Sequence, residues 1–467
     1  MLRTLAAAIG QQAGKEISLS GWVQARRDHG KIIFIDLRDA SGLAQCVFTG
    51  GLGEELRPEW VVQVSGEVAR RPENMVNKNL ESGQWEVKCK DLKILSKAET
   101  PPLPLDTPGY DIDEEIRLKY RYLDLRRPRL QKNLRVRHKI IKFIRDYLDQ
   151  RGFVEVETPI LSKSTPEGAR DYLVPARLHP GKFYALPQSP QQYKQLLMVA
   201  GLEKYYQIAR CFRDEDTRGD RQPEFTQLDL EMSFVEKNDV MNLIEALYTE
   251  LVKVLFPDKK IWQEPFPRFT HKEITEKYGS DKPDLRQDKN NPDELAFAWV
   301  TDFPFFEEIK EKVMPALRSS EGTKKWTFTH NPFSAPQGEH STSALTQQYD
   351  LVLNGYEIGG GSIRAHQPEV LRQTLKTIGL DDKTIAENFG HMLEAFSFGA
   401  PPHGGIAMGL DRLAAILQNE PNIREVIAFP KTGDGRDPMM KAPGEVTKEQ
   451  LNELWLDIKP SKKNKPS

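Results

Sequence analysis

Residues 209–234 read ARCFRDEDTRGDRQPEFTQLDLEMSF, and this stretch decides how the rest of the chain is interpreted. Two runs with strand character flank a loop that carries Arg213, Glu215 and further arginines around a Gly-Asp turn. Buried strands rarely end in so many charges unless a ligand binds there. Arginine binds phosphate oxygens, Glu215 could hold a divalent cation, and Phe225 could stack on a base. A surface hairpin joined by ion pairs is the alternative.

A second motif, YDLVLNGYEIGGGSIR, spans residues 349–364. Asp350 and Glu357 lie seven positions apart, so on one regular strand they would face opposite sides of the sheet. A bulge or a bend is needed to bring them together. The glycine triplet at 359–361 leaves room for a ligand or a neighbouring backbone to pass closely.

A third motif, GAPPHGGIAMGLDRLAAIL, spans residues 399–417 and leads from glycines into a helix expected to begin near Asp411. Small residues before a helix admit a nucleotide, and Arg412 could meet its phosphate or stack on its ring. The spacing is neither that of a Walker loop nor that of the Rossmann fingerprint. The chain contains no GxSxG or HExxH sequence. This set of residues therefore indicates phosphoryl or nucleotidyl transfer by positioning and charge neutralisation.

The first 97 residues predict an all-β domain. Five runs rich in β-branched and aromatic residues begin near residues 17, 31, 43, 60 and 85, with turn residues between them. They suit a small barrel of the oligonucleotide-binding (OB) type, and another small β-barrel is equally compatible. The proline-rich segment 98–116 predicts a stiff linker at a domain boundary.

The remainder predicts a helical connection and then a mixed α+β domain. Residues 117–150 are predicted to form a helix. Its stretch from Arg117 to Arg145 has twelve Lys/Arg residues against one acid, and these charges could follow a phosphate backbone or form a solvated face. From about residue 152 to about 435, strand candidates outnumber interleaved helices, which favours a large antiparallel sheet flanked by helices. The basic end of the chain is expected to be disordered. The helix candidates are residues 191–201, 238–256, 366–377, 382–396 and 411–418.

Composition narrows the class of protein. The 467 residues carry a formal charge of −2, with 38% hydrophobic and 29% charged residues, which is typical of a globular protein. No apolar run approaches the ~20 residues of a membrane helix. The three cysteines are isolated in the sequence, which fits a reducing compartment and predicts a cytoplasmic location.

The motifs resemble those of class II aminoacyl-tRNA synthetases. VEVETPILSKSTPEGARDYLV resembles their motif 1, residues 209–234 resemble motif 2, and GIAMGLDRL resembles motif 3. The blocks KYRYLDLRRP, ALPQSPQQYKQLLM, YGSDKPDLR and NGYEIGGGSIR closely resemble the bacterial-type aspartyl-tRNA synthetases. The likeness runs from about residue 21 to about residue 438.

The resemblance implies an architecture and a reaction. We expect an anticodon-binding OB-fold at 1–97, a hinge at 98–135, a catalytic domain on an antiparallel sheet at 136–440 and a C-terminal extension at 441–467. It implies a homodimer, ATP with Mg²⁺, L-aspartate and tRNA-Asp. Aspartate would attack the α-phosphorus of ATP, and the resulting aspartyl-adenylate would charge the 3′ end of the tRNA.

The resemblance also implies residue roles. The implied catalytic residues are Arg213, Glu215 and Arg412. Those implied for aspartate are Glu167, Gln191, Lys194, Arg213, Asp229, His330 and Arg364. Those implied for ATP are Arg213, Asp214, Glu215, Gln222, Phe225, Glu357, Gly409, Leu410, Asp411 and Arg412, with Asp350 and Glu357 for the metal.

The barrel residues Arg27, Phe34 and Gln45 match positions where the family contacts the anticodon. The chain departs from the family in three ways. A large inserted domain that usually follows YGSDKPDLR is missing, and Asn331 stands where the family often has a second histidine. His29 is associated in this family with relaxed anticodon discrimination, which adds tRNA-Asn to the predicted substrates.

Three other functions remain open: a relative that charges asparagine or lysine, a non-catalytic RNA-binding paralogue, and an aspartate-adenylating enzyme that makes asparagine. The resemblance implies that Lys194 and Arg364 hold the side-chain carboxylate of the substrate. Two such cations would reject lysine and disfavour asparagine, whose amide leaves a buried cation unpaired. The intact arginines disfavour the paralogue. The N-terminal barrel would have no task in the asparagine-making enzyme.

Overall fold

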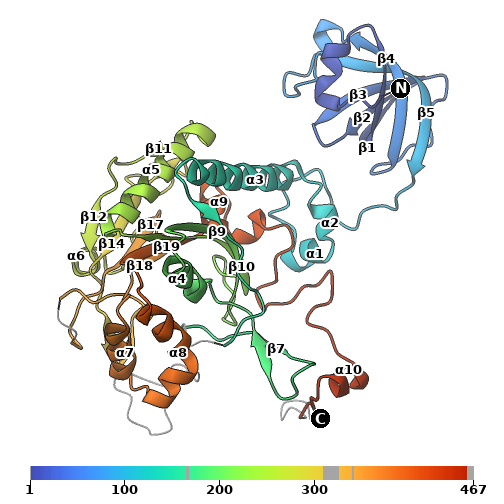
Figure 1. Ribbon diagram of the computed structural model, residues 1–467. Helices are drawn as coiled ribbons and strands as arrows, with labels where there is room; N and C mark the ends of the chain where they lie inside the picture. The colour runs from blue at the N-terminus through green and yellow to red at the C-terminus, as the bar shows by residue number, and fades with distance from the viewer. Residues whose placement is uncertain (1, 165–167, 309–325, 339–340, 460–467) are drawn as a thin grey trace. The chain divides into compact units, whose positions relative to one another are not determined.

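The structure is a computed structural model that describes residues 2–164, 168–308, 326–338 and 341–459. The chain divides into two units, residues 1–109 and 110–467, and each is described by itself (Figure 1). Glu167, one of the predicted aspartate ligands, lies outside the described residues.

The first unit is a closed five-stranded barrel in the order β1-β2-β3-β5-β4. Inward-facing residues alternate with outward-facing ones, as in β2, where Ile33, Ile35 and Leu37 are buried. The predicted OB-type barrel is thereby confirmed. Its strands are β1 (Glu16–His29), β2 (Ile32–Arg38), β3 (Leu43–Thr49), β4 (Val61–Arg70) and β5 (Trp85–Ser96).

The second unit is built on an eight-stranded sheet in the order β12-β14-β17-β18-β19-β10-β9-β6. The central pairs are antiparallel, as predicted, whereas both edge pairs, β12 with β14 and β6 with β9, are parallel. The sheet is therefore mixed. Its strands are β6 (Val154–Glu155), β9 (Lys204–Phe212), β10 (Glu224–Ser233), β12 (Arg268–Thr270), β14 (Phe297–Thr301), β17 (Gln348–Leu353), β18 (Tyr356–Ile363) and β19 (His403–Gly409).

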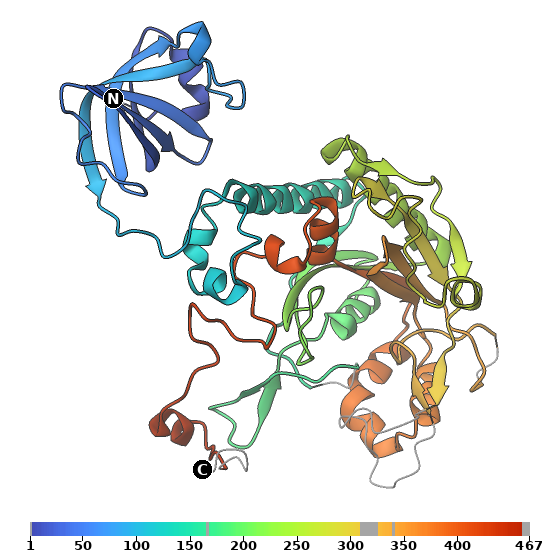
Figure 2. The ribbon, with the colours of Figure 1, turned by 180° about the vertical axis from the view of Figure 1, so that it is seen from behind.

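Helices cover both faces of this sheet. The helices α3 (Pro128–Asp149), α5 (Lys237–Leu255) and α9 (Leu410–Leu417) share one hydrophobic core with it, and α4 (Gln191–Val199) lies on the other side (Figures 1 and 2). The helices α7 (Pro368–Thr377) and α8 (Asp382–Ser397) pack on each other in a separate cluster. The other described α-helices and strands are α1 (Glu114–Lys119), α2 (Arg121–Asp124), α6 (His271–Tyr278), α10 (Lys448–Glu453), β7 (Leu173–Pro175), β8 (Phe183–Ala185), β11 (Lys260–Ile261), β13 (Glu294–Leu295), β15 (Phe306–Glu308) and β16 (Trp326–Phe328).

The central strand β10 has two chemically different faces. Leu228 and Leu230 are fully buried in the hydrophobic core beneath α3, α5 and α9. Because side chains alternate along a strand, Gln227, Asp229 and Glu231 lie together on the opposite face. That polar face is where a binding site can form.

The helix predicted over 117–150 is wrong in its extent, because the structure divides this segment into α1, α2 and α3. Pro128 begins α3, and the residue before it, Arg127, is extended, as expected before a proline. Three of the basic side chains of α3 form ion pairs within this unit: Arg129 with Glu420 and Glu425, Arg137 with Asp411, and Arg145 with Glu155. These three basic side chains are thus paired with carboxylates inside this unit.

Among the residues that the structure describes, none of the helices combines the length and the apolar character needed to span a bilayer. Cys46, Cys89 and Cys211 are free thiols.

We predict that Gly361→Ala destabilises the protein by about 1–3 kcal/mol, because overpacking a core strand has this cost. A Cβ at this position would overlap the Gly405 carbonyl oxygen of the neighbouring strand and approach the Tyr349 ring at 2.7 Å. Urea unfolding measures the change. The control is Gly390→Ala in α8, where an added Cβ meets nothing within 4 Å, so the unfolding midpoint should rise. A Gly361→Ala variant as stable as the wild type would contradict the packing described.

Candidate active site

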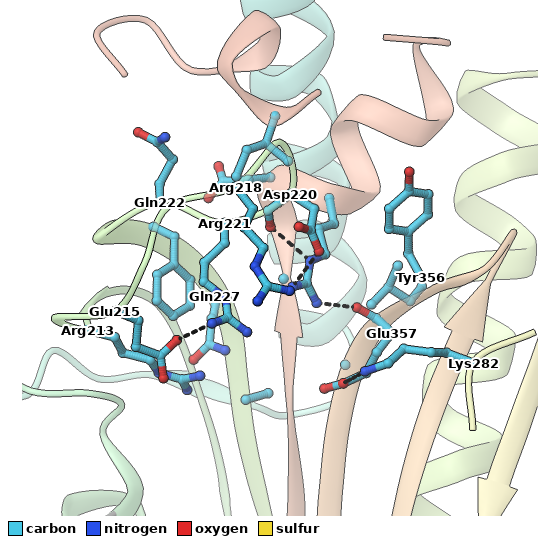
Figure 3. Close-up of a pocket in the computed structure, with 18 of the residues that line it drawn as sticks. Arg213, Glu215, Arg218, Asp220, Arg221, Gln222, Gln227, Lys282, Tyr356 and Glu357 are labelled. Carbon is cyan, nitrogen blue, oxygen red and sulfur yellow. Dashed lines mark hydrogen bonds and ion pairs between the residues drawn. The ribbon is translucent and has the colours of Figure 1, made fainter. Parts of the chain in front are cut away.

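A cavity of about 440 Å³ opens beside the central strands, a size that is typical of small-molecule sites (Figure 3). It is lined mainly by the loop between β9 and β10, by β18 and by the start of α9. Its charged and aromatic lining residues are Arg213, Glu215, Arg218, Asp220, Arg221, Phe225, Lys282, Tyr356, Glu357, Asp411 and Arg412.

The wall formed by the β9–β10 loop carries a stacked pair. The guanidinium of Arg213 lies 5.1 Å from the centre of the Phe225 ring. Arg213 Nε is buried and has no hydrogen-bond partner in the described part of the chain. Since a buried donor without a partner destabilises a fold, this atom is positioned to receive an acceptor from a ligand.

Ion pairs hold the rest of this loop. Glu215 pairs with Arg221 at 3.0 Å, and Arg412 pairs with Asp220 at 3.1 Å (Figure 3). Arg412 also donates to the Glu357 carbonyl oxygen at 2.6 Å, so one side chain joins the loop to β18. The ion pairs expected from the alternative, a surface hairpin, are thus present. The same hairpin also forms one wall of the cavity.

Asp350 and Glu357 lie on two different strands, β17 and β18, which a turn at Asn354 and Gly355 connects. The bend that the spacing required is a hairpin turn, in which the Asn-Gly pair, both at positive φ, reverses the chain. A register shift after Leu351 supplies the irregularity that the spacing predicted. Burial, and then the charge of Glu357, raise the pKa of Asp350 well above its ordinary value.

Glu357 behaves differently from Asp350. Partial burial acts to raise its pKa, but the charges of Lys282 and Arg412 outweigh this effect and lower the pKa of the carboxyl. Lys282 Nζ lies 3.3 Å from Glu357 Oε2. His330 lies 4.0 Å from Asp350 and packs edge-on against Phe303, and burial lowers the pKa of this histidine.

Four charged side chains form a buried cluster on the polar face of the sheet. Lys194 Nζ from α4 lies 2.8 Å from Asp229 Oδ2 and 3.3 Å from Glu231 Oε2. Arg364 donates to both oxygens of Glu231, at 2.8 and 3.1 Å, and to Ser362 Oγ at 2.8 Å. All four side chains are at most 2% exposed.

The pKa values reflect how the cluster compensates for burial. Burial acts to raise the pKa of Glu231, but the charges of Arg364 and Lys194 outweigh it and hold this pKa at about 2. Burial raises the pKa of Asp229 in spite of Lys194. Tyr205 donates to Gln207, and Asp229 Oδ1 has no hydrogen-bond partner in the described structure. The cluster therefore holds two paired cations and one free carboxylate oxygen.

Small residues on β19 and β18 make room for these carboxylates. Gln227, Asp229 and Glu231 pair across the sheet with Gly409, Ala407 and Gly405. A Cβ on Gly405 would overlap Glu231 Oε2, and one on Gly360 would lie 2.7 Å from Asp350 Oδ1. The glycines thus admit neighbouring side chains and backbone.

The structure brings most of the predicted nucleotide residues together. The predicted residues that line the cavity are Arg213, Glu215, Gln222, Phe225, Glu357, Gly409, Asp411 and Arg412. Lys194, Asp229 and Arg364 lie instead in the buried cluster. Gln191 begins α4, and its Nε2 has no partner among the described residues. Asp214 is exposed beside Arg170, and the Leu410 side chain packs in the hydrophobic core.

The sequence interpretation gave no role to Glu231, Lys282 or Arg137. Glu231 follows Asp229 by two residues, so strand alternation could have placed both on one face. Lys282 stands in a quoted block without an assigned function. Arg137 pairs with Asp411, which also accepts the Thr226 backbone N–H at 3.0 Å. No local signal announces such a contact between distant segments.

The barrel carries a second group of predicted residues. Arg27 pairs with Asp36 at 2.5 Å, and His29 meets Phe34 edge-to-face with ring centres 5.5 Å apart. Gln45 donates to Glu86 at 3.1 Å. Arg71 Nη2, which is buried, has no partner in the described part of the barrel. Polar side chains beside an aromatic pair are typical of surfaces that bind unstacked bases.

Comparison with known proteins identifies the family. Residues 113–433 match the tRNA synthetases class II (D, K and N), and residues 17–95 match the OB-fold nucleic acid binding domain. The chain therefore belongs to the class II tRNA synthetases of the D, K and N group.

Similar curated proteins extend over almost the whole chain. The Aspartate--tRNA(Asp/Asn) ligase of Rubrobacter xylanophilus is 42% identical, covering 95% of each chain, and that of Syntrophomonas wolfei is 40% identical, covering 96% of this chain and 97% of its own. The Rubrobacter comparison runs over 583 positions against 467 residues here, so more than a hundred positions of that relative face gaps. This difference fits the missing inserted domain.

Solved structures share the fold. Asparaginyl-tRNA synthetase from Pyrococcus horikoshii, complexed with asparaginyl-adenylate, has a TM-score of 0.73 at 22% identity, covering 92% of this chain and 98% of that one. Aspartyl tRNA synthetase from Entamoeba histolytica has a TM-score of 0.71 at 22% identity, covering 92% and 91%.

We predict that Glu231→Gln destabilises the protein by about 3–5 kcal/mol at neutral pH, because it breaks a buried ion-pair cluster. A folded-state pKa of about 2 against an ordinary 4.5 contributes about 3 kcal/mol of stability, fully present above pH 4.5 and lost as the pH falls toward 2. The gap in unfolding free energy between wild type and variant should therefore narrow from pH 6 to pH 3. Urea unfolding at several pH values measures it.

The matched control is Glu224→Gln on the same strand, which breaks an exposed pair with Arg210 and should cost about 0–1 kcal/mol. A gap for Glu231→Gln that is independent of pH would contradict the assignment of a low pKa to this carboxyl.

Proposed function

We propose that this chain is an aspartate–tRNA ligase that forms aspartyl-adenylate from L-aspartate and ATP and transfers the aspartyl group to the 3′ end of tRNA-Asp. The observation that carries the proposal is the buried cluster of Lys194, Asp229, Glu231 and Arg364. It presents two cations and one unpartnered carboxylate oxygen on the same sheet face as the nucleotide-sized cavity. A small amino acid with a carboxylate side chain is complementary to this set.

The unpartnered atoms suggest how aspartate binds. Its side-chain carboxylate would lie between Lys194 and Arg364, and its ammonium group would donate to Asp229 Oδ1. Its α-carboxylate would face Arg213, whose Nε lacks a partner among the described residues. Gln191 and His330 stand as further proposed contacts. Asparagine would place an amide NH₂ against a cation, which weakens its binding.

The cavity residues would bind and orient ATP. Adenine would stack on Phe225, with Arg412 over its other face and near the γ-phosphate. Arg213 would stabilise the negative charge that develops at the α-phosphate when the aspartate carboxylate attacks. Asp411, held by Arg137, fixes the start of α9 next to Arg412. Positioning and charge neutralisation are the main sources of catalysis in this type of transfer.

Asp350 and Glu357 would hold Mg²⁺ together with phosphate oxygens of ATP. Mg²⁺ is commonly bound by one or two carboxylates plus substrate phosphates, and these two side chains fit that ligand set. The described residues contain no group of three or more His, Cys, Asp or Glu suited to a metal by themselves. When bound, the ion neutralises phosphate charge.

The barrel would read the anticodon of the tRNA through Arg27, Phe34 and Gln45, with Glu86 and Arg71 beside them. We further propose that tRNA-Asn is a second substrate, since His29 packs against Phe34 at this surface and the curated relatives carry the name Aspartate--tRNA(Asp/Asn) ligase. We also propose a cytoplasmic location, because the proposed substrates, tRNA, ATP and aspartate, are found there.

We also propose a homodimer. Large apolar side chains are exposed in the motif 1 sequence, which contains β6 and the start of β7, and in the segment after it that leads into β8. The exposed side chains are Val154, Ile160, Leu161, Leu173, Leu178 and Phe183. Exposed large apolar side chains that gather in one part of the sequence are the kind that a protein–protein interface would cover.

The test of the function is amino-acid-dependent exchange of pyrophosphate into ATP. L-Aspartate should drive exchange, L-asparagine should drive it far more weakly, and L-lysine not at all. If asparagine were the preferred amino acid, the chain would instead be an asparaginyl-tRNA synthetase, as the similar Pyrococcus horikoshii structure is named. No exchange with any amino acid would contradict the proposal.

Arg364→Ala should lower kcat/KM for aspartate in this assay by at least about 100-fold, because it removes a charged partner of the substrate carboxylate. ATP binding, measured by fluorescence quenching, should remain, which separates this loss from unfolding. The matched control is Arg372→Ala, an exposed arginine 3.6 Å from Asp382, which should leave exchange unchanged. The same kcat/KM for aspartate in Arg364→Ala and Arg372→Ala would contradict the assignment of Arg364 to the substrate site.

His29→Leu should reduce charging of tRNA-Asn relative to tRNA-Asp by about tenfold, since it changes the ring that packs on Phe34 at the anticodon surface. Aminoacylation of the two purified tRNAs measures the ratio. The same ratio in wild type and variant would exclude His29 as a determinant of tRNA range.

A further inference from the structure

Lys282 stands at the end of the cavity where Glu357 lies. It belongs to the loop that follows α6, and its Nζ donates to Glu357 Oε2 at 3.3 Å. Both side chains line the same cavity as Arg213 and Arg412. Figure 3 shows the Lys282 side chain running to the carboxylate of Glu357, with their contact marked.

The contact is accessible rather than locked in the core. The side chain of Lys282 is 44% exposed and that of Glu357 is 36% exposed. The Glu357 backbone is fixed, because its carbonyl accepts from Arg412 at 2.6 Å and its strand pairs with β17. The lysine, on a flexible four-carbon stem, is therefore the more mobile partner.

Two cations compete for this carboxylate. A Mg²⁺ ion bound by Glu357 would lie about 2.0–2.1 Å from an oxygen that now accepts from the ammonium group. The ion and the ammonium would then repel each other across a few ångströms. The groups that act on Asp350, the other proposed metal ligand, are Gln348, His330, Asp281, Glu357 and Lys282 itself, so Lys282 acts on both carboxylates.

We propose that Lys282 is a placeholder cation and a positioning residue of the nucleotide site. It neutralises Glu357 while the cavity is empty, and it gives up this carboxylate when the metal–nucleotide complex enters. Its ammonium group then turns to the phosphate oxygens of the incoming nucleotide. The inference rests on the proposed function only in taking a nucleoside triphosphate as the ligand of this cavity.

The test measures binding of Mn²⁺, as a stand-in for Mg²⁺, by electron paramagnetic resonance with and without a non-hydrolysable ATP analogue. Lys282→Met should bind Mn²⁺ alone about tenfold more tightly than wild type, because the competing cation is gone. The same variant should bind the Mn²⁺–analogue complex about tenfold more weakly, because a phosphate contact is lost. A merely structural role would not move the two affinities in opposite directions.

Two further variants sharpen the test. Lys282→Arg keeps a cation and should retain the wild-type affinity for Mn²⁺ alone. Lys289→Met removes an exposed lysine of the same loop that does not line the described cavity, and it should match wild type in both measurements. Unchanged or weaker binding of Mn²⁺ alone by Lys282→Met would overturn the placeholder role, and undiminished binding of the Mn²⁺–analogue complex would overturn the phosphate contact.

Metal and nucleotide binding do not depend on which amino acid is activated. Failure of aspartate to drive pyrophosphate exchange would therefore contradict the proposed function and would leave the role of Lys282 unaffected.

Discussion

The site depends on one buried interaction, in which Arg364 and Lys194 both bind the carboxylate of Glu231. Placing ions in a protein interior costs several kcal/mol for each, so such a cluster persists only when every charge is compensated. Arg364 and Lys194 are thereby held as a pair of cations that water does not screen. Gly405 is required opposite Glu231, because any side chain there would occupy the space of the carboxylate.

One strand connects this cluster to the nucleotide cavity. Phe225, Gln227, Asp229 and Glu231 alternate onto the same face of β10. At about 3.4 Å for each residue, Phe225 and Asp229 lie about 14 Å apart along the strand, roughly the length of an aminoacyl-adenylate. The rigid sheet would therefore fix the spacing between the base and the amino acid. Charged side chains from the loops would neutralise the phosphates.

The sequence predicted the elements better than the contacts between them. The five barrel strands, the central antiparallel strands and the α4 and α9 helices follow from local periodicity, and motif resemblance grouped Arg213, Phe225 and Arg412 correctly into one cavity. The 117–150 helix was too long because Pro128 was not given its role as a helix start. The spacing of Asp350 and Glu357 predicted a bulge or a bend between them, but not that it is a hairpin turn at Asn354 and Gly355. Lys282 stayed without a role because its contact with Glu357 spans 75 residues of sequence.

The central claim is that two buried cations select a short carboxylate side chain. Calorimetric titration of the wild-type protein with L-aspartate and with L-asparagine, at one pH and salt concentration, tests it most directly. The account predicts that L-asparagine binds at least about tenfold more weakly, which corresponds to about 1.4 kcal/mol. Equal affinity for the two amino acids, or tighter binding of L-asparagine, would contradict it.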